Sequence, residues 1–266
     1  MNERREIEFN FVDRGNLDKY CAILNDCFPK ANFSIEYLQW LYFENPNGKV
    51  IGFDAFDQGK LVGHYVCIPI KLLGISELGL LSLNTATIPS HRGMGLFGTL
   101  AKLTYDFAKD NNFRCVIGVA NKASTKSFLR HLGFTMLGSL DMRIGFLNRD
   151  LSGTRGYSVD ELDWRARSPR VKARLKSKGK VTKFIFLITK AKIPISAFLP
   201  LYGSDLSDLK NIFTIGITVD WQLGKKPIFR LPAKLKPSPL NLILKNLDES
   251  NPYILTSWSL PDFDAF

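Results

Sequence analysis

The residues best suited to chemistry lie between Thr87 and Phe97, where the sequence reads Thr-Ile-Pro-Ser-His-Arg-Gly-Met-Gly-Leu-Phe. A predicted strand over Leu80–Ile88 ends here, two glycines follow, and a predicted amphipathic helix spans Gly95–Asn111. Glycines let a backbone approach a ligand closely, and the start of a helix offers N–H groups without intrahelical acceptors at the positive end of its dipole. The combination predicts a pyrophosphate site, although the glycine spacing matches neither the P-loop nor the Rossmann pattern.

A second segment follows the predicted buried strand Phe113–Val119. It contains Asn121 and Ser124, and it closes with Leu132-Gly133-Phe134 after a helix predicted over Ser124–His131. Here the sequence resembles the GNAT superfamily of CoA-dependent N-acyltransferases. Arg92-Gly93-Met94-Gly95 is similar to the superfamily's R/Q-x-x-G-x-G/A loop, and the second segment is similar to its N-x-x-S…L-G-F helix. The resemblance covers roughly residues 5–147.

The resemblance implies an α/β fold with a mixed, splayed β-sheet flanked by helices, and acyl-CoA (acetyl-CoA or a hydroxyacyl-CoA) as co-substrate. It implies that the pantetheine arm lies between the strands Leu81–Ile88 and Phe113–Val119 and pairs with the backbone of Thr85–Thr87. A backbone N–H there would polarise the thioester carbonyl. The residues that it assigns to acyl-CoA are Thr85, Ala86, Thr87, Arg92, Gly93, Met94, Gly95, Leu96, Phe97, Asn121, Ser124, Ser127 and Phe128.

The sequence departs from the family pattern at three places. Phe97 replaces the last small residue of the loop, and Phe128-Leu129 stand where many relatives carry a tyrosine that protonates the leaving thiolate. The strand over Leu81–Ile88 holds no carboxylate, and Asn84 and Thr85 occupy that stretch. The lack of a base favours an amine of lowered pKa, such as an amino sugar, because an alkylammonium with a pKa near ~10.4 stays protonated at neutral pH.

The candidate catalytic residues are therefore Asn84, Thr85 and His64. His64 is the alternative base because imidazole titrates near neutrality, and an ordinary strand histidine is the other interpretation. Aromatic residues of the early helices are candidates for the acceptor site, with burial in the core as their alternative: Phe28, Phe33, Trp40 and Tyr42.

A narrower resemblance concerns the acceptor. The R-G-x-G-L-F loop, the W-x-x-x-x-N-P helix end and the final Asp262–Phe266 are similar to a bacterial branch that includes nucleotide-sugar N-acyltransferases. It implies acylation of a nucleotide-linked amino deoxysugar for lipopolysaccharide or capsule biosynthesis. The alternatives are an N-acetyltransferase for an antibiotic, polyamine, peptide or protein amine, or a basic nucleic-acid or membrane-binding module on a GNAT scaffold.

The net charge is concentrated in one segment. The chain has 36 basic and 25 acidic residues, hence +11, and Arg165–Lys192 contains eleven basic residues and no Asp or Glu. Such a span favours a polyanion or is simply a solvated face. We expect it to meet a diphosphate acceptor, with no nucleic acid and no stable membrane insertion.

The pattern of the sequence changes near residue 150, from alternating helix and strand signals to strands separated by long loops. We predict a GNAT domain over residues 1–149 and a smaller β-rich domain over residues 150–266 that completes the acceptor site. Its predicted strands are Val181–Ile188, Ile212–Trp221 and Tyr253–Trp258, and the last of these is a candidate to return to the core sheet. Leu38-x-Trp40 before Pro46 is echoed by Leu162-x-Trp164 before Pro169, which is either a degenerate duplication or a coincidence.

Other features set limits on the function. The four cysteines form no C-x-x-C pair and the three histidines have no zinc-ligand spacing, so we expect no metal. The N-terminus lacks the apolar core of a signal peptide, and no apolar run is long enough for a membrane helix. We therefore expect a cytoplasmic protein, and a homodimer is left open.

Overall fold

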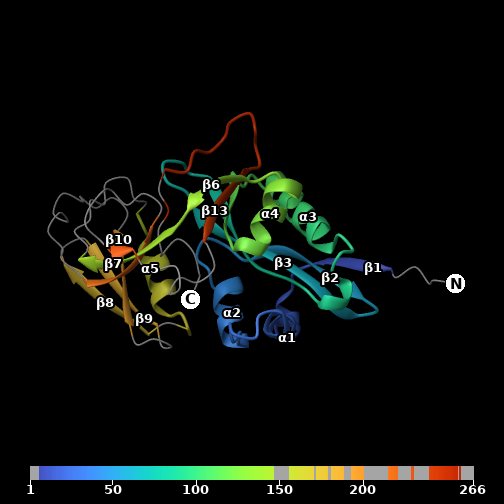
Figure 1. Cartoon of the computed structure of the whole chain (residues 1–266), viewed down its shortest axis with the longest axis horizontal. Coiled ribbons are helices and arrows are strands. Elements are labelled where there is room, and N and C mark those ends of the chain that lie inside the picture. The colour runs from blue at the N-terminus through green and yellow to red at the C-terminus, as the bar shows by residue number, and fades with distance from the viewer. Residues whose placement is uncertain are drawn as a thin grey trace.

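The protein forms two β-sheets that lie side by side (Figure 1). The computed structural model describes residues 6–146, 156–170, 172–178, 181–188, 193–200, 215–220, 229–230, 240–256 and 258. For the strands of the second sheet, the description is limited to the backbone.

The first sheet is mixed. Its strands, in spatial order, are β1 (Ile7–Phe11), β2 (Ile51–Asp57), β3 (Lys60–Lys71), β4 (Leu78–Thr87), β5 (Cys115–Ala120), β13 (Asn241–Asn246) and β6 (Thr135–Ser139). Neighbours run antiparallel except β4 and β5, which are parallel. The central strands read as continuous apolar runs because both faces of the sheet are covered.

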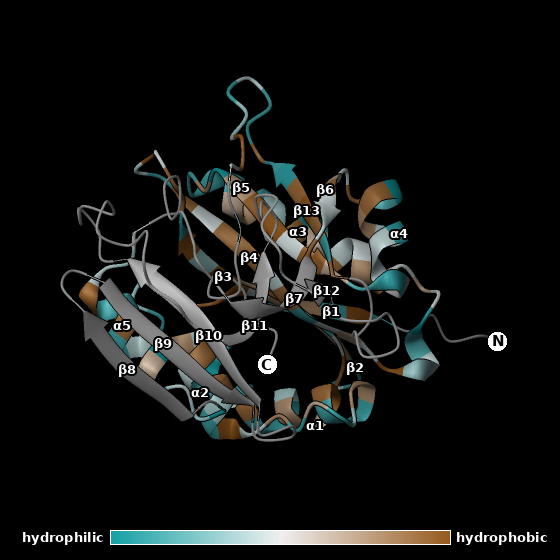
Figure 2. Ribbon diagram, turned by 60° about the vertical axis from the view of Figure 1, so that its left-hand side comes forward, coloured by the Kyte–Doolittle hydropathy of each residue, from teal (hydrophilic) through white to brown (hydrophobic). Residues whose placement is uncertain are grey.

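Four helices cover the two faces of this sheet (Figure 1): α1 (Leu17–Cys27) and α2 (Ile35–Phe43) on one side, and α3 (Leu96–Asp110) and α4 (Lys122–His131) on the other. Two core clusters follow from the alternation of the strands. Leu81 and Ile117 pack with α1 and α2, whereas their neighbours Leu80 and Val116 pack with α3. Figure 2 shows the apolar strands between the helices.

The strands β4 and β5 separate part of the way along their length. They are paired over Leu80–Ser82 and Val116–Gly118, and both then continue without pairing to each other. On its other side, β4 has a bulge against β3, where the single residue Tyr65 stands opposite Asn84 and Thr85. Asn84 has φ of 45°, a left-handed conformation that asparagine adopts more readily than most residues. The mixed, splayed sheet predicted from the sequence is confirmed.

The second sheet repeats the order of the first. Its strands, in spatial order, are β8 (Lys172–Lys178), β9 (Val181–Ile188), β10 (Ile193–Pro200), β11 (Ile215–Asp220), β7 (Asp141–Phe146) and β12 (Phe229–Arg230). The pairing is antiparallel, antiparallel, parallel, antiparallel and antiparallel, as it is from β2 to β6 in the first sheet. The two halves of the chain exchange one strand. In the first sheet, β13 from the second half lies between β5 and β6, and in the second sheet, β7 from the first half lies between β11 and β12.

A pair of tryptophans joins the two halves. The helix α5 (Val159–Ala166) precedes β8 as α2 precedes β2, and both helices begin at a serine cap six residues before the tryptophan. Trp40 Nε1 donates to the carbonyl of Trp164 at 2.8 Å, and Trp164 Nε1 donates to the carbonyl of Trp40 at 3.1 Å. The rings stack with centroids 4.7 Å apart. This reciprocal contact and the repeated strand order support duplication as the origin of the echo in the sequence.

The strand exchange changes two expectations. The predicted boundary near residue 149 does not follow the sheets, because β7 lies in the second sheet and β13 in the first. The strand that returns to the first sheet is β13, and residues 253–256 form no strand. Their alternating burial has another cause: Tyr253 and Leu255 pack into the core, while the Tyr253 N–H and hydroxyl bond to Asn246 and Leu73 in place of a ladder.

Candidate active site

A cavity of about 660 Å³ occupies the gap between the separating strands β4 and β5. Its walls include the end of β4 over residues 82–87, the end of β5 with Asn121, and side chains from α1 to α4. Beyond Ser82, the edge of β4 that faces β5 has no strand partner among the described residues. An extended ligand can therefore pair with this backbone, as the pantetheine arm would in a GNAT fold.

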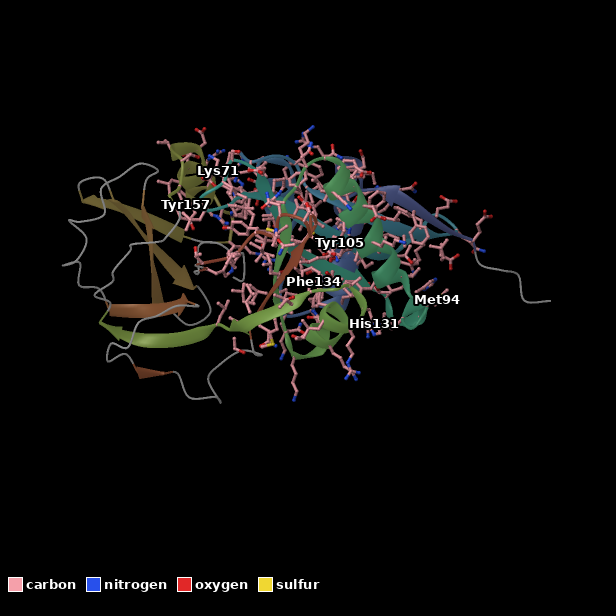
Figure 3. All side chains as sticks on the ribbon, turned by 90° about the horizontal axis from the view of Figure 1, so that it is seen from above. Lys71, Met94, Tyr105, His131, Phe134 and Tyr157 are labelled. Atoms are coloured by element: carbon pink, nitrogen blue, oxygen red, sulfur yellow. The ribbon has the colours of Figure 1, made fainter. Side chains whose placement is uncertain are left out.

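The glycine loop lies at one end of the cavity. Gly93 and Gly95 have φ of 80° and 78°, and a Cβ built on either meets no atom within 4 Å. Gly95 caps the N-terminus of α3, whose first N–H groups have no intrahelical acceptor. Met94 lies on the outside of the molecule and is 46% exposed (Figure 3). Open space beside a helix start fits the pyrophosphate expected from the sequence.

Most residues predicted to hold acyl-CoA line the cavity: Thr85, Ala86, Thr87, Arg92, Phe97, Asn121, Ser124, Ser127 and Phe128. Gly93, Met94, Gly95 and Leu96 form the loop and the first turn of α3 next to it. Arg92 Nε donates to the carbonyl of Thr87 at 3.1 Å, which folds its side chain back over the end of β4. Phe97 packs edge-on against Tyr65 and Phe128, so its ring forms part of the wall.

Asn121 begins the second predicted segment. Its Oδ1 accepts from the Ser124 N–H at 2.9 Å, and its carbonyl accepts from the Thr125 hydroxyl at 2.6 Å. Asn121 thus caps α4 and lines the cavity at the same time. Gly133, with φ of 70°, ends this helix before Phe134 returns to the core, where Figure 3 shows it beside Tyr105.

The three candidate catalytic residues have different positions. Asn84 and Thr85 form the bulge of β4 and line the cavity. His64 is fully buried on β3, where Nδ1 lies 2.7 Å from Asp54 Oδ1, and it does not belong to the cavity wall. His64 therefore cannot act on a substrate directly, because the side of β3 that carries it is covered by α1 and α2.

The aromatic candidates also divide. Phe28 and Phe33 line the cavity, and Tyr37 joins them although the sequence did not single it out. The structure places Trp40 and Tyr42 in the core, at 3% and 0% exposure. Trp40 packs on Trp164 of α5, and Tyr42 packs on His64 of the sheet, so neither ring reaches the cavity wall.

Three cavity residues come from beyond the first 150 residues: Arg170, Leu240 and Ile243. Arg170 is the charged residue among them. Arg170 follows α5, lines the cavity and donates to the carbonyls of Ala31 and Asn32 at 3.0 and 3.4 Å. Its guanidinium lies 3.5 Å from the ring centroid of Tyr37 and 4.6 Å from that of Phe33. Arg170 belongs to the basic span Arg165–Lys192, and nothing in its sequence neighbourhood indicates that it lines the site. The side chains of that span beyond Arg170 lie outside the described part of the structure.

The wall of the cavity combines apolar and polar side chains, and the polar ones include no acid among the described residues. Among its described lining residues there is no Asp, Glu or His, while Arg92 and Arg170 supply positive charge. Within the described part of the chain, no group of three His, Cys, Asp or Glu residues is placed to hold a metal ion. In the same part, no helix has the length and apolarity to cross a membrane.

The comparison with protein families identifies the first domain. The model of the Acetyltransferase (GNAT) family matches residues 17–134, which contain both sequence motifs, the strands β4 and β5, and most of the cavity wall. These residues form a GNAT acetyltransferase domain. The GNAT fold predicted from the sequence is thus confirmed, and the protein is an acyltransferase that uses CoA and an amine acceptor.

Several solved structures resemble the GNAT domain. A GNAT family N-acetyltransferase (YhbS) from Escherichia coli in complex with CoA has 18% identity and a TM-score of 0.41, covering 51% of this chain and 72% of that one. A ribosomal-protein-alanine N-acetyltransferase from Brucella melitensis has 21% identity and a TM-score of 0.43, covering 50% and 88%. A putative acetyltransferase from Acinetobacter baylyi has 15% identity and a TM-score of 0.46, covering 52% and 84%. The search of curated proteins finds no match.

The GNAT domain offers a consistent set of groups for acyl-CoA. Acyl-CoA supplies the thioester that the amine attacks. The loop over residues 92–97 presents N–H groups and Arg92 for the phosphates, and the free edge of β4 presents backbone groups for the extended arm. Phe97 and Phe128 pack edge to face and form an apolar part of the wall. Proximity and backbone polarisation are the contributions to acyl transfer that this arrangement offers.

Proposed function

We propose that this acyltransferase acts on the amine of a nucleotide-linked amino deoxysugar, with acetyl-CoA or a hydroxyacyl-CoA as donor. The observation that carries the proposal is the charge of the cavity wall: besides Arg92 at the CoA loop, it has Arg170 and, among the described lining residues, no carboxylate. A polyamine or an aminoglycoside carries several cationic groups that need carboxylates as partners. A diphosphate needs guanidinium groups, which bind its oxygens through paired hydrogen bonds.

The aromatic residues of the wall suit the rest of such an acceptor. Phe28, Phe33 and Tyr37 line the cavity on the side of α1 and α2, and Phe28 is 39% exposed. Flat apolar rings give a nucleobase or a sugar a surface on which to stack. Arg170 lies against two of these rings, so a diphosphate between base and sugar would meet its charge.

The chemistry of the amine points the same way. An amine that must lose a proton without a base on the cavity wall should be a weaker base than an alkylamine. Electron-withdrawing sugar hydroxyls lower the pKa of an amine in this manner. With the narrower resemblance of the sequence, this supports our proposal that the enzyme serves lipopolysaccharide or capsule biosynthesis in the cytoplasm, with residues 150–266 completing the acceptor site.

The proposal is tested by thiol release from acetyl-CoA and a hydroxyacyl-CoA with a panel of amines. The panel contains UDP- and dTDP-linked amino sugars, free glucosamine, spermidine, kanamycin and a peptide with a free N-terminus. The nucleotide-linked sugars should give the highest kcat/KM. Faster turnover of spermidine, kanamycin or the peptide would refute the proposed acceptor and leave the acyltransferase assignment intact.

Arg170 provides a sharper version of this test. Arg170→Gln should raise KM for the nucleotide-linked sugar about tenfold, because a hydrogen bond to a charged group contributes about 1.5–3 kcal/mol. Its KM for free glucosamine should stay within about twofold, since no phosphate is lost. Arg167→Gln is the matched control, because Arg167 is exposed and pairs with Asp163 on α5. Equal changes in both variants would remove Arg170 from the acceptor site.

A further inference from the structure

A chain of polar side chains leads from the core of the GNAT domain to the cavity wall. His64 Nδ1 lies 2.7 Å from Asp54 Oδ1, and His64 Nε2 lies 3.1 Å from the hydroxyl of Tyr42. Asn84 Nδ2 donates to the same hydroxyl at 2.9 Å. The four side chains come from β2, β3, α2 and β4, and Asn84 is the member that lines the cavity. Asp54, His64 and Tyr42 are each 0% exposed.

The direction of each hydrogen bond follows from the number of donors. Asp54 also accepts from the Tyr20 hydroxyl at 2.6 Å, so its second oxygen takes the proton on Nδ1 of His64. Burial raises the pKa of Tyr42 well above its ordinary value, so its hydroxyl keeps its proton. In the tautomer with the proton on Nδ1, Nε2 of His64 is an acceptor, so the Tyr42 hydroxyl donates to Nε2 and its oxygen accepts from an Asn84 N–H.

This direction fixes the orientation of the Asn84 carboxamide. Because Nδ2 is held by Tyr42, the oxygen Oδ1 lies on the other branch of the amide. Among the described residues, none donates a hydrogen bond to Oδ1. The bulge and the left-handed backbone at Asn84 cost about 1 kcal/mol or more and persist because the surrounding contacts hold them. A strained residue on a cavity wall with an available acceptor is suited to positioning a ligand.

We propose that Asp54, His64 and Tyr42 are positioning residues that hold the Asn84 oxygen toward the cavity, where it accepts a hydrogen bond from an N–H of the attacking amine. This bond orients the nitrogen so that its lone pair faces the thioester carbon. The amide oxygen is no base, so the proton that the amine finally loses goes elsewhere. The proposal rests on acyl transfer to an amine and not on the identity of the acceptor.

Nuclear magnetic resonance of ¹⁵N-histidine-labelled full-length protein tests the chain without any substrate. The ring of His64 is expected to carry its proton on Nδ1 at pH 7.5, with Nε2 unprotonated. A proton on Nε2 would overturn the proposal, because Tyr42 would then accept from His64 and donate to Asn84. The Asn84 oxygen would in that case face Tyr42 and not the cavity.

Kinetics test the consequence for acyl transfer. Acetyl-CoA with hydroxylamine is the probe, since this small amine does not depend on recognition of a nucleotide sugar. Tyr42→Phe should lower kcat about tenfold, the effect of one lost positioning hydrogen bond, with KM for acetyl-CoA unchanged. Tyr105→Phe is the matched control, because it removes a buried phenol hydroxyl bonded to Tyr65 on the other face of the sheet. It should lower the Tm by a similar amount and leave kcat unchanged.

A double variant separates positioning from general destabilisation. Asn84→Ala should lower kcat as much as Tyr42→Phe does, and the combined variant should be no slower than Asn84→Ala alone. Independent losses that multiply in the combined variant, or a kcat for Tyr42→Phe equal to that of Tyr105→Phe, would overturn the proposal. If Tyr42→Phe does not fold, the histidine spectrum of the wild-type protein still decides.

Discussion

Gly95→Ala separates the role of the glycine loop in folding from its role in binding. Gly95 has φ of 78° and a Cβ there meets no atom within 4 Å, so the substitution costs only backbone strain of about 1–2 kcal/mol. Gly59, in the turn between β2 and β3, has φ of 76° and equally open surroundings. Gly59→Ala is therefore a matched control, and each variant should lower the Tm by about 2–4 °C per kcal/mol of strain.

The two variants should differ in CoA binding. Next to Gly95, the open space is where the phosphates would contact the first N–H groups of α3. A methyl group there should remove at least one hydrogen bond to a charged oxygen, worth about 1.5–3 kcal/mol, or about 10–150-fold in Kd. Isothermal titration calorimetry with CoA measures this difference. Equal CoA affinity of Gly95→Ala and Gly59→Ala would refute the assignment of the loop.

Two further predictions concern the core. Trp164→Ala should lower the free energy of unfolding, measured in urea titrations, by about 3–5 kcal/mol. It removes the ring stacked on Trp40 and the N–H that bonds to the Trp40 carbonyl. A loss below about 1 kcal/mol would show that the contact between Trp40 and Trp164 is not tightly packed. Burial raises the pKa of Cys67 and Cys115 to about 12 from an ordinary value of 9.0. The unfolded chain then loses these thiol protons first, so stability should fall as the pH rises from about 9 to about 12, and less steeply in Cys67→Ala. Identical alkaline profiles of the variant and the wild-type protein would contradict this.

Local patterns in the sequence were sufficient to predict most of the GNAT domain. The loop before α3 and the end of α4 at Gly133 depend on a few adjacent residues and on glycine conformations. The residues expected to bind acyl-CoA followed from the resemblance to the GNAT superfamily, whose loop motif is recognisable because β4, the loop and α3 are consecutive in the chain.

Long-range partnerships could not be predicted in this way. Residues 253–256 alternate between buried and exposed positions as a half-buried strand does, yet they form no strand, whereas β13 is a run of three buried apolar residues, Leu242–Leu244. Only the tertiary structure distinguishes a strand from an extended segment packed on the core. The contact of Arg170 with Tyr37 and the chain from Asp54 to Asn84 join side chains that are far apart in sequence. Tyr37 could have been recognised because it lies one helical turn before Trp40, which the sequence did offer as an acceptor candidate.

Strand exchange explains why the second half was difficult to divide from the first. A strand that completes the other sheet has the composition of a normal central strand, so β7 and β13 carry no mark of their destination. The repeated sequence motif is short, one Leu-x-Trp tripeptide followed by a proline. The reciprocal hydrogen bonds of Trp40 and Trp164 show that its two copies occupy equivalent, contacting positions. A duplication can thus be preserved in topology after its sequence has diverged.

A crystal structure of the full-length protein with CoA tests most directly the claim that this cavity is where acyl transfer takes place. The pyrophosphate should lie against the N–H groups of residues 92–97, and the pantetheine arm should lie between β4 and β5 along Leu83–Thr87 with its thiol near Asn84. CoA bound at any other surface, with the gap between β4 and β5 closed, would contradict the assignment of the site.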